Sequence, residues 1–120
     1  MVTNQDINNF VMRANRRSWE PLVEKGIAYA GISVIPLRYD EKQRRSPSIL
    51  LKFEPGSRYP YHSHPGGEEV YVLGGDAIFK DVALTTGDYL YTPPGFRHSV
   101  TTNHGCVLLF IVPEEVEILE

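Results

Sequence analysis

The chain has 120 residues, of which 42% are hydrophobic and 22% are charged, and its formal net charge is −3 at pH 7. This length supports one domain, residues 1–120, with a core of its own, and the slight acidic excess argues against a nucleic-acid partner. The single cysteine, Cys106, rules out an intrachain disulfide, and neither a signal peptide nor a membrane-spanning apolar run is present, so we expect a cytoplasmic protein with no membrane partner.

The first segment predicts a short helical arm over residues of about 3–17. Thr3 and Asp6 resemble a capping box with aspartate in the glutamate position. Apolar residues follow at helical spacing: Ile7, Phe10, Val11 and Ala14. A stripe of only four residues fits a helix that covers a barrel or a subunit contact better than one that lies on a membrane. The barrel itself is expected to span residues of about 19–120.

Short apolar segments separated by turn residues predict an all-β fold for the remaining chain. The expected strands span residues 27–37, 49–53, 70–73, 77–79, 89–92, 96–101 and 106–112. We expect a polar loop with solvated basic residues over 40–48, and a tight hairpin at Gly74-Gly75-Asp76. The last strand is apolar throughout, so one face should meet the barrel interior and the other the N-terminal segment or a second subunit.

Two histidines and a carboxylate lie within seven residues in the stretch from Gly56 to Gly75. His62 and His64 are two residues apart, so on an extended chain both imidazoles point the same way. If the strand that follows the Pro-Gly-Gly bend keeps the same alternation, the side chain of Glu68 points the same way as the two histidines and that of Glu69 points away. These nitrogen and oxygen donors suit a divalent first-row metal, and a fourth donor should come from elsewhere in the chain.

The other histidines and the nucleophiles are less distinctive. His98 follows a Pro-Pro-Gly turn at the start of a strand, where a ligand role and a structural role carry equal weight, whereas His104 lies in an Asn-His-Gly turn and is expected at the surface. Nucleophilic catalysis is not expected, because Ser63 would point away from its flanking histidines and Cys106 sits in an apolar strand. The aromatic residues are expected to belong to the core.

The spacing of these residues resembles the two motifs of the cupin superfamily. The first motif is matched by Gly56, His62, His64, Glu68 and Gly75. The second motif is matched by Gly87, Pro93, Gly95 and His98. Thr102 stands where the second motif ends in asparagine, and the neighbouring Asn103 is a candidate for the same role.

The resemblance implies a double-stranded β-helix, the jelly-roll barrel of cupins, with one divalent metal ion, Fe, Zn, Mn or Ni, held by His62, His64, Glu68 and His98. The residues around both motifs are similar to the cupin domain of zinc-dependent anti-sigma factors and to dihydroxyacetophenone and β-diketone dioxygenases. Those anti-sigma factors carry a helical zinc domain ahead of the cupin. The roughly 18 residues before Trp19 hold no cysteine or histidine for such a domain, so sigma-factor binding is not expected.

Two functions are compatible with this ligand set. The first, which we favour, is a non-haem iron dioxygenase that cleaves a β-diketone or hydroxyketone chelated to the metal, with no catalytic residue assigned beyond the metal ligands. The second is a non-catalytic zinc- or manganese-bound module that binds a small effector or uses the metal to stiffen the barrel. In both, the partner is a small molecule, and the apolar last strand and N-terminal arm also predict a homodimer.

Overall fold

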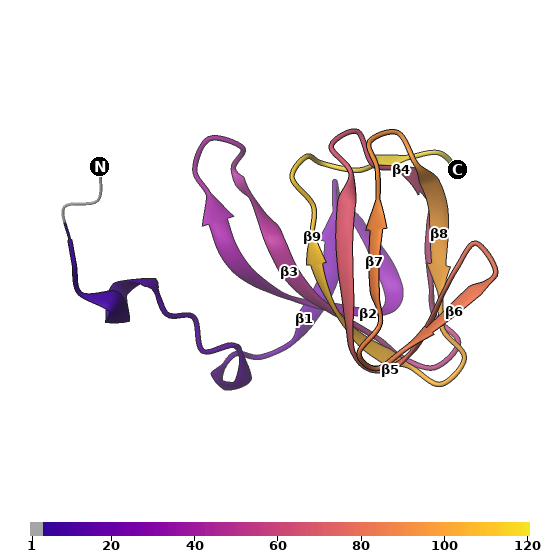
Figure 1. Cartoon of the computed structure of the whole chain (residues 1–120), viewed down its shortest axis with the longest axis horizontal. Coiled ribbons are helices and arrows are strands. Elements are labelled where there is room, and N and C mark those ends of the chain that lie inside the picture. Colours follow the sequence, from indigo (N-terminus) through magenta and orange to yellow (C-terminus); the bar gives the residue numbers. More distant parts are fainter. Residues whose placement is uncertain (1–3) are drawn as a thin grey trace.

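The computed structural model describes residues 4–120, which form an antiparallel barrel preceded by an extended N-terminal segment (Figure 1). Its strands are β1 (Glu20–Glu24), β2 (Ile27–Asp40), β3 (Arg45–Phe53), β4 (Arg58–Ser63), β5 (Glu68–Phe79), β6 (Val82–Thr85), β7 (Tyr89–Thr92), β8 (Arg97–Thr101), β9 (Cys106–Ile111) and β10 (Glu117–Ile118). The predicted all-β class is therefore confirmed. Between residues 4 and 120, no helix is both long and apolar enough to cross a membrane.

The barrel consists of two curved sheets that share one strand. One sheet contains β1, β2, β3, β9, β7 and the first half of β5, and the other contains β10, β4, β8, β6 and the second half of β5. Alternate side chains of both sheets point inward, as strand geometry requires. The resulting core includes Leu51, Phe53, Val70, Val72, Ala77, Phe79, Val100, Leu108 and Phe110.

The long strand β5 corrects the hairpin predicted at Gly74-Gly75-Asp76. The chain does not reverse there, because β5 runs straight through and changes partner, pairing with β9 as far as Gly75 and with β6 from Asp76 onward. Gly75 has φ +82°, and a Cβ atom on it would lie 2.0 Å from the carbonyl oxygen of Gly105. Gly75 therefore allows a close approach of two backbones where the strand passes between sheets, whereas a Cβ atom on Gly74 would have no atom within 4 Å.

The polar loop predicted over residues 40–48 is shorter than expected. β2 continues to Asp40 and β3 begins at Arg45, so only residues 41–44 form the turn. Strands β1, β6 and β10 were not predicted. Each is at most five residues long; β1 and β10 lack a strong apolar pattern, and the apolar run of β6 is only three residues.

The predicted N-terminal helix is wrong apart from two single turns of 3₁₀-helix, η1 (Ile7–Phe10) and η2 (Ala14–Arg16). The backbone N–H of Asn8 donates a 3.0 Å hydrogen bond to the side chain of Asp6, which caps η1, whereas Thr3 lies outside the described residues. Ile7 and Phe10 are 74% and 63% exposed. A short, asparagine-rich segment with no surface to pack against does not sustain an α-helix.

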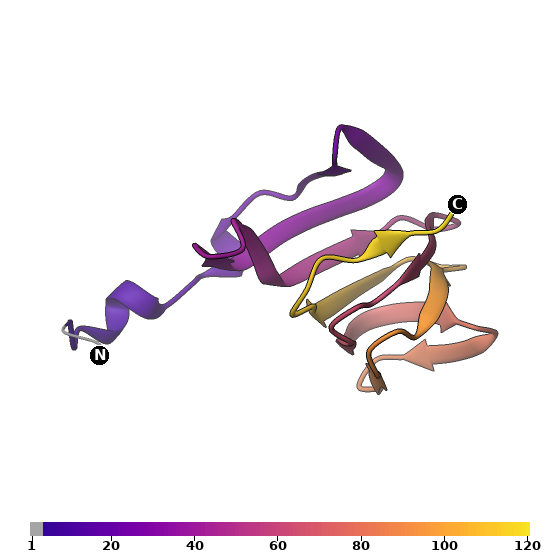
Figure 2. The ribbon, with the colours of Figure 1, turned by 90° about the horizontal axis from the view of Figure 1, so that it is seen from above.

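The last strand, β9, is covered on one face. Cys106, Leu108 and Phe110 are buried in the barrel, as predicted, while the residues between them are only half-buried on the outer face of the sheet. The N-terminal segment does not cover this outer face, because it runs away from the barrel in both views (Figures 1 and 2). That part of the prediction is wrong.

We expect Gly75→Ala to destabilise the barrel strongly, because its new Cβ would overlap the backbone of Gly105. Gly26→Ala is the matched control, since Gly26 has φ +79° and no atom within 4 Å of an added Cβ. The control should lose only about 1–2 kcal/mol, the cost of a left-handed backbone, and Gly75→Ala a further ~1–3 kcal/mol. Urea unfolding measures both changes, and equal losses would contradict the close-contact interpretation.

Candidate metal centre

The structure brings the four predicted ligand residues together inside the barrel. His62 lies on β4, His64 directly follows that strand, Glu68 begins β5, and His98 on β8 pairs directly with His62. The turn between β4 and β5 is closed by a hydrogen bond from the N–H of Gly67 to the carbonyl oxygen of His64. All four side chains are at most 3% exposed.

The turn after His64 restarts the strand in the expected phase. Glu68 points inward and is 3% exposed, whereas Glu69 is exposed and accepts a 2.6 Å hydrogen bond from the hydroxyl of Tyr89. The predicted contrast between the two neighbouring glutamates is therefore confirmed as a matter of placement.

A β-bulge places one further side chain beside the histidines. Tyr59 and His62 are three residues apart, which on a regular strand would put them on opposite faces. The pairing of β4 with β8 shifts register between them, so both point inward, and their rings meet edge to face at 4.8 Å between centroids. Pro60 lies within this bulge, where the ladder does not need its missing N–H.

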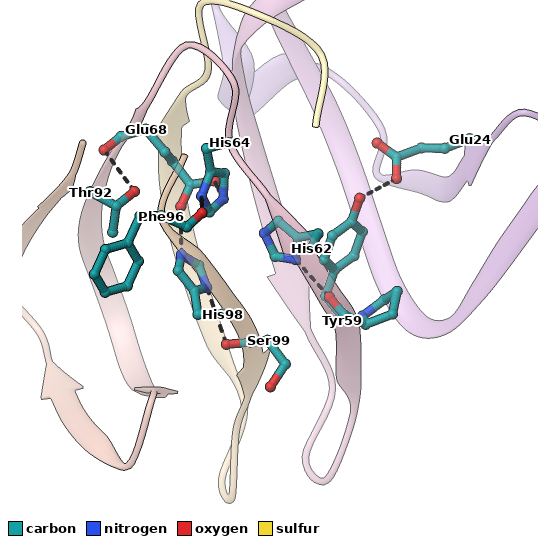
Figure 3. Close-up of polar contacts among 10 residues, drawn as sticks. Glu24, Tyr59, His62, His64, Glu68, Thr92, Phe96, His98 and Ser99 are labelled. Atoms are coloured by element: carbon teal, nitrogen blue, oxygen red, sulfur yellow. Dashed lines mark hydrogen bonds and ion pairs between the residues drawn. The ribbon is translucent and has the colours of Figure 1, made fainter. Parts of the chain in front are cut away.

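The polar atoms of the site face one another closely. The ligand nitrogens of His62, His64 and His98 all lie within 4.8 Å of one another. Glu68 Oε2 is 2.9 Å from His64 Nε2, and Glu68 Oε1 is 3.5 Å from His98 Nε2 (Figure 3). Three imidazoles and one carboxylate thus surround a common point.

Backbone carbonyls orient the three imidazoles. The Nδ1 atoms lie near carbonyl oxygens, at 2.6 Å for His62 and Pro60, 3.2 Å for His64 and Phe96, and 3.2 Å for His98 and Ser99. Because a carbonyl oxygen can only accept, each Nδ1 carries a proton, and in a neutral imidazole this leaves the lone pair on Nε2. Metal-binding histidines are commonly held in this way.

Several of these atoms lack a hydrogen-bond partner within residues 4–120. They are His64 Nε2, His98 Nε2 and Glu68 Oε1, and all three are buried. Buried lone pairs without a donor cost free energy, and a divalent cation coordinated by them removes that cost. The residues present therefore fit a metal ion.

Electrostatics favour the protonation states that bind metals. Burial lowers the pKa of His62 to about 4, which keeps this imidazole neutral at physiological pH. Burial raises the pKa of Glu68, but its contacts with His64 and His98 outweigh burial and lower the pKa overall, so the carboxylate is anionic. Neutral imidazoles and a carboxylate are the usual ligands of first-row metals.

The remaining histidine and the cysteine lie outside the site, as predicted. The His104 side chain is 86% exposed, and its Nδ1 lies 3.2 Å from Asp76 Oδ1. Cys106 is buried, and burial raises its pKa to about 11, so it remains a thiol at neutral pH. Neither residue can serve the histidine cluster or provide a ready nucleophile.

Thr102 itself, rather than Asn103, supplies the side chain that holds the turn after β8. Its hydroxyl donates a 2.6 Å hydrogen bond to the carbonyl oxygen of Asp76 and accepts one of 2.9 Å from the N–H of Gly105. Asn103 contributes only its backbone N–H, which donates to the carboxylate of Asp76.

A cavity of about 630 Å³ leads to His62 and Glu68, and most of its inner wall is apolar. The hydroxyl of Tyr59 donates a 2.5 Å hydrogen bond to Glu24 on this wall (Figure 3). Sequence reasoning missed both residues because β1 was not predicted and regular alternation does not place Tyr59 beside His62. The Lys25-Gly26 pair that follows Glu24 is a turn signal that could have revealed the strand.

Residues 8–117 match the family described as the ChrR cupin-like domain. The chain belongs to this cupin family. Its structure is similar to an acetylacetone dioxygenase from Acinetobacter johnsonii, with a TM-score of 0.77 and 14% identity over 100% of this chain and 81% of that one. It is also similar to an RmlC-like cupin from Ralstonia eutropha, with a TM-score of 0.77 and 22% identity over 92% and 71% of the two chains.

These two structures share the fold, and the predicted jelly-roll barrel is thereby confirmed. A curated relative, the oxalate-binding protein of Thermotoga maritima, is 35% identical over 66 residues, which are 51% of this cupin and 54% of that protein. The chain thus spans about half the length of the curated relative that it matches.

We predict that His62→Ala removes metal binding, because it deletes one of three clustered imidazoles, whereas His104→Ala binds the metal as the wild type does. Elemental analysis after dialysis against a zinc-buffered solution measures the stoichiometry of each variant. His104 provides a matched histidine control outside the cluster. Equal losses from the two substitutions would refute the assignment of the site.

Proposed function

We propose that this cupin is a dioxygenase that cleaves a β-diketone or hydroxyketone, with one iron ion bound by His62, His64, Glu68 and His98. The observation that carries the proposal is the buried cluster of three imidazoles, with Glu68 at 2.9 Å from one of them and 3.5 Å from another. Three of its polar atoms lack a hydrogen-bond partner within residues 4–120, and His62 and Glu68 line a largely apolar cavity. Iron bound by such a mixed nitrogen and oxygen set supplies Lewis acidity and redox chemistry.

The chain supplies the geometry around that ion. The carbonyl of Pro60 fixes the ring of His62, and the carbonyls of Phe96 and Ser99 do the same for His64 and His98. The anionic Glu68 offsets part of the charge of a divalent ion in a buried site. Four protein donors leave open the remaining positions of an ion that takes six ligands, and these can accept the two oxygens of a chelating substrate.

The cavity supports a ketone with hydrocarbon substituents over oxalate, the ligand in the name of the Thermotoga maritima relative. A volume of about 630 Å³ is in the range of sites that hold drug-sized ligands. Its wall includes Val34, Leu51 and Phe110, whose side chains can bury apolar substituents and exclude water. Oxalate has no apolar part to contact them.

Oxygen uptake tests the proposal. Protein purified without added metal is first analysed for its native metal, and the iron-loaded form is then given acetylacetone, other β-diketones and hydroxyacetophenones in an oxygen electrode. We expect uptake with at least one compound, none with the zinc-loaded control, and none with His98→Ala. Tight native zinc together with no uptake from any compound would instead support the non-catalytic module, because four donors also complete a tetrahedral zinc site.

We also propose that two copies of the chain associate. Large apolar side chains are exposed on the outer face of β5 and β7 and on the N-terminal segment: Tyr71, Leu73, Tyr89, Tyr91, Ile7 and Phe10. The N-terminal segment leaves its own barrel (Figure 2), so a second copy is the surface available to its apolar residues.

Light scattering coupled to gel filtration measures this association. We expect the wild type to elute at twice the monomer mass, and Ile7→Ser with Phe10→Ser to shift the protein toward the monomer. Asn8→Ser, in the same turn, is the matched control and should not change the mass. A monomeric wild type at tens of micromolar would contradict the dimer.

A further inference from the structure

The cavity wall carries one polar pair that the metal site does not use. Glu24 ends β1, and Tyr59 lies in the bulge of β4, 7% exposed. The phenol donates its hydrogen bond to Glu24 Oε1, and within residues 4–120 no lysine or arginine lies at ion-pair distance from that carboxylate. Glu24 is half-buried, and no hydrogen bond to its Oε2 is made within residues 4–120, so this oxygen can accept one from a ligand on a wall that is otherwise mostly apolar.

The surroundings of Glu24 indicate which donor would suit it. Basic residues from separate segments gather around the same cavity: Arg17, Lys25, Arg44 and Arg45. Arg44 in the β2–β3 turn is exposed, as the sequence predicted, and Arg45 begins β3. The charges of Lys25 and Arg45 already act on Glu24, so a neutral hydroxyl group is a sufficient donor for it. Burial also raises the pKa of Glu24 more than its hydrogen bond with Tyr59 lowers it, so a ligand donor there relieves a real cost.

We propose that Glu24 and Tyr59 form a recognition site for a hydroxyl group carried by the ligand at the end remote from its chelating oxygens. The site rests on the proposed function, in that a ketone occupies the metal. Glu24 accepts the hydrogen bond of this hydroxyl, and Tyr59 holds the carboxylate in place. A site built to bind a hydroxyl discriminates strongly against the analogue that lacks it, because the carboxylate is then left unpaired.

The size of the tyrosine side chain sets the span of the ligand. Tyr59 packs against His62 at one edge and reaches Glu24 with its hydroxyl (Figure 3). One phenol therefore bridges the distance from a metal-site histidine to the carboxylate. An aryl substituent of a chelated ketone that lies along Tyr59 brings its para position near Glu24, and Leu51 and Phe110 offer apolar contacts for the ring.

Binding to the iron(II)-loaded protein in the absence of oxygen tests the site without catalysis. Calorimetry at neutral pH compares benzoylacetone with 4-hydroxybenzoylacetone, two β-diketones that differ by one hydroxyl group. We expect the wild type to bind the hydroxylated compound at least tenfold more tightly. Glu24→Gln should reduce this preference to about threefold or less while keeping the affinity for benzoylacetone and the iron content, because a neutral acceptor replaces a charged one.

The rim residue Glu115 provides the matched control, since it lines the same cavity but pairs with Lys25 at 3.6 Å. Because Glu115 acts on Glu24 only through its charge, Glu115→Gln should change the preference far less than Glu24→Gln does. The recognition site would be overturned if the wild type bound the two diketones equally well, a comparison that needs no variant. It would also be overturned if Glu24→Gln lost affinity for both diketones to the same extent. A hydroxyl preference without oxygen uptake by the iron form would overturn the dioxygenase and leave the recognition site standing. Oxygen uptake without any hydroxyl preference would overturn the recognition site and leave the dioxygenase standing. If neither diketone bound, both proposals would be overturned.

Discussion

The register of β4 against β8 is the constraint on which the site depends, because it sets His62 directly opposite His98. A slip of one residue in β4 would turn His62 and His64 out of the barrel together. The bulge before His62 adds to this constraint. Tyr59 and His62 are three residues apart and would point to opposite faces of a regular strand, but the bulge places both on the inner face. Metal site and cavity wall are thus positioned by one irregular strand.

The polar side chains of this centre lower the stability of the barrel when no metal is bound. Three imidazoles and a carboxylate occupy volume inside the barrel that apolar side chains would otherwise fill, and some of their lone pairs have no donor. The pKa of His62 falls because the barrel withholds water from a protonated ring. A metal ion bound there would offset both penalties in the folded chain alone, and would stabilise the fold in proportion to its affinity for the native state.

Local rules predicted the parts of this protein that local geometry determines. Alternation along an extended chain placed His62 and His64 on one face, and the Pro-Gly-Gly bend kept Glu68 in phase with them. The same rules failed at Gly74-Gly75, a pair that is typical of a hairpin, because Gly75 instead allows a close contact with Gly105, 30 residues later in the chain. The helix predicted from apolar spacing failed for a related reason, since Ile7 and its neighbours have nothing to pack against. Both errors depend on long-range contacts, which Gly75 makes and the N-terminal segment lacks, and the local spacing of residues does not reveal them.

The metal ligands constrain the chemistry of this cupin less than the wall of its cavity does. Histidines and a glutamate in this arrangement suit iron, zinc and manganese alike, so a shared fold and ligand set leave the reaction open. The wall combines a largely apolar lining with charged residues of both signs and with Glu24, which the phenol of Tyr59 holds. In the proposed complex, the ligand has an apolar body for the lining, a chelating end for the metal and a hydroxyl for Glu24. Oxalate has only the chelating end, and a simple β-diketone offers no donor to Glu24 Oε2.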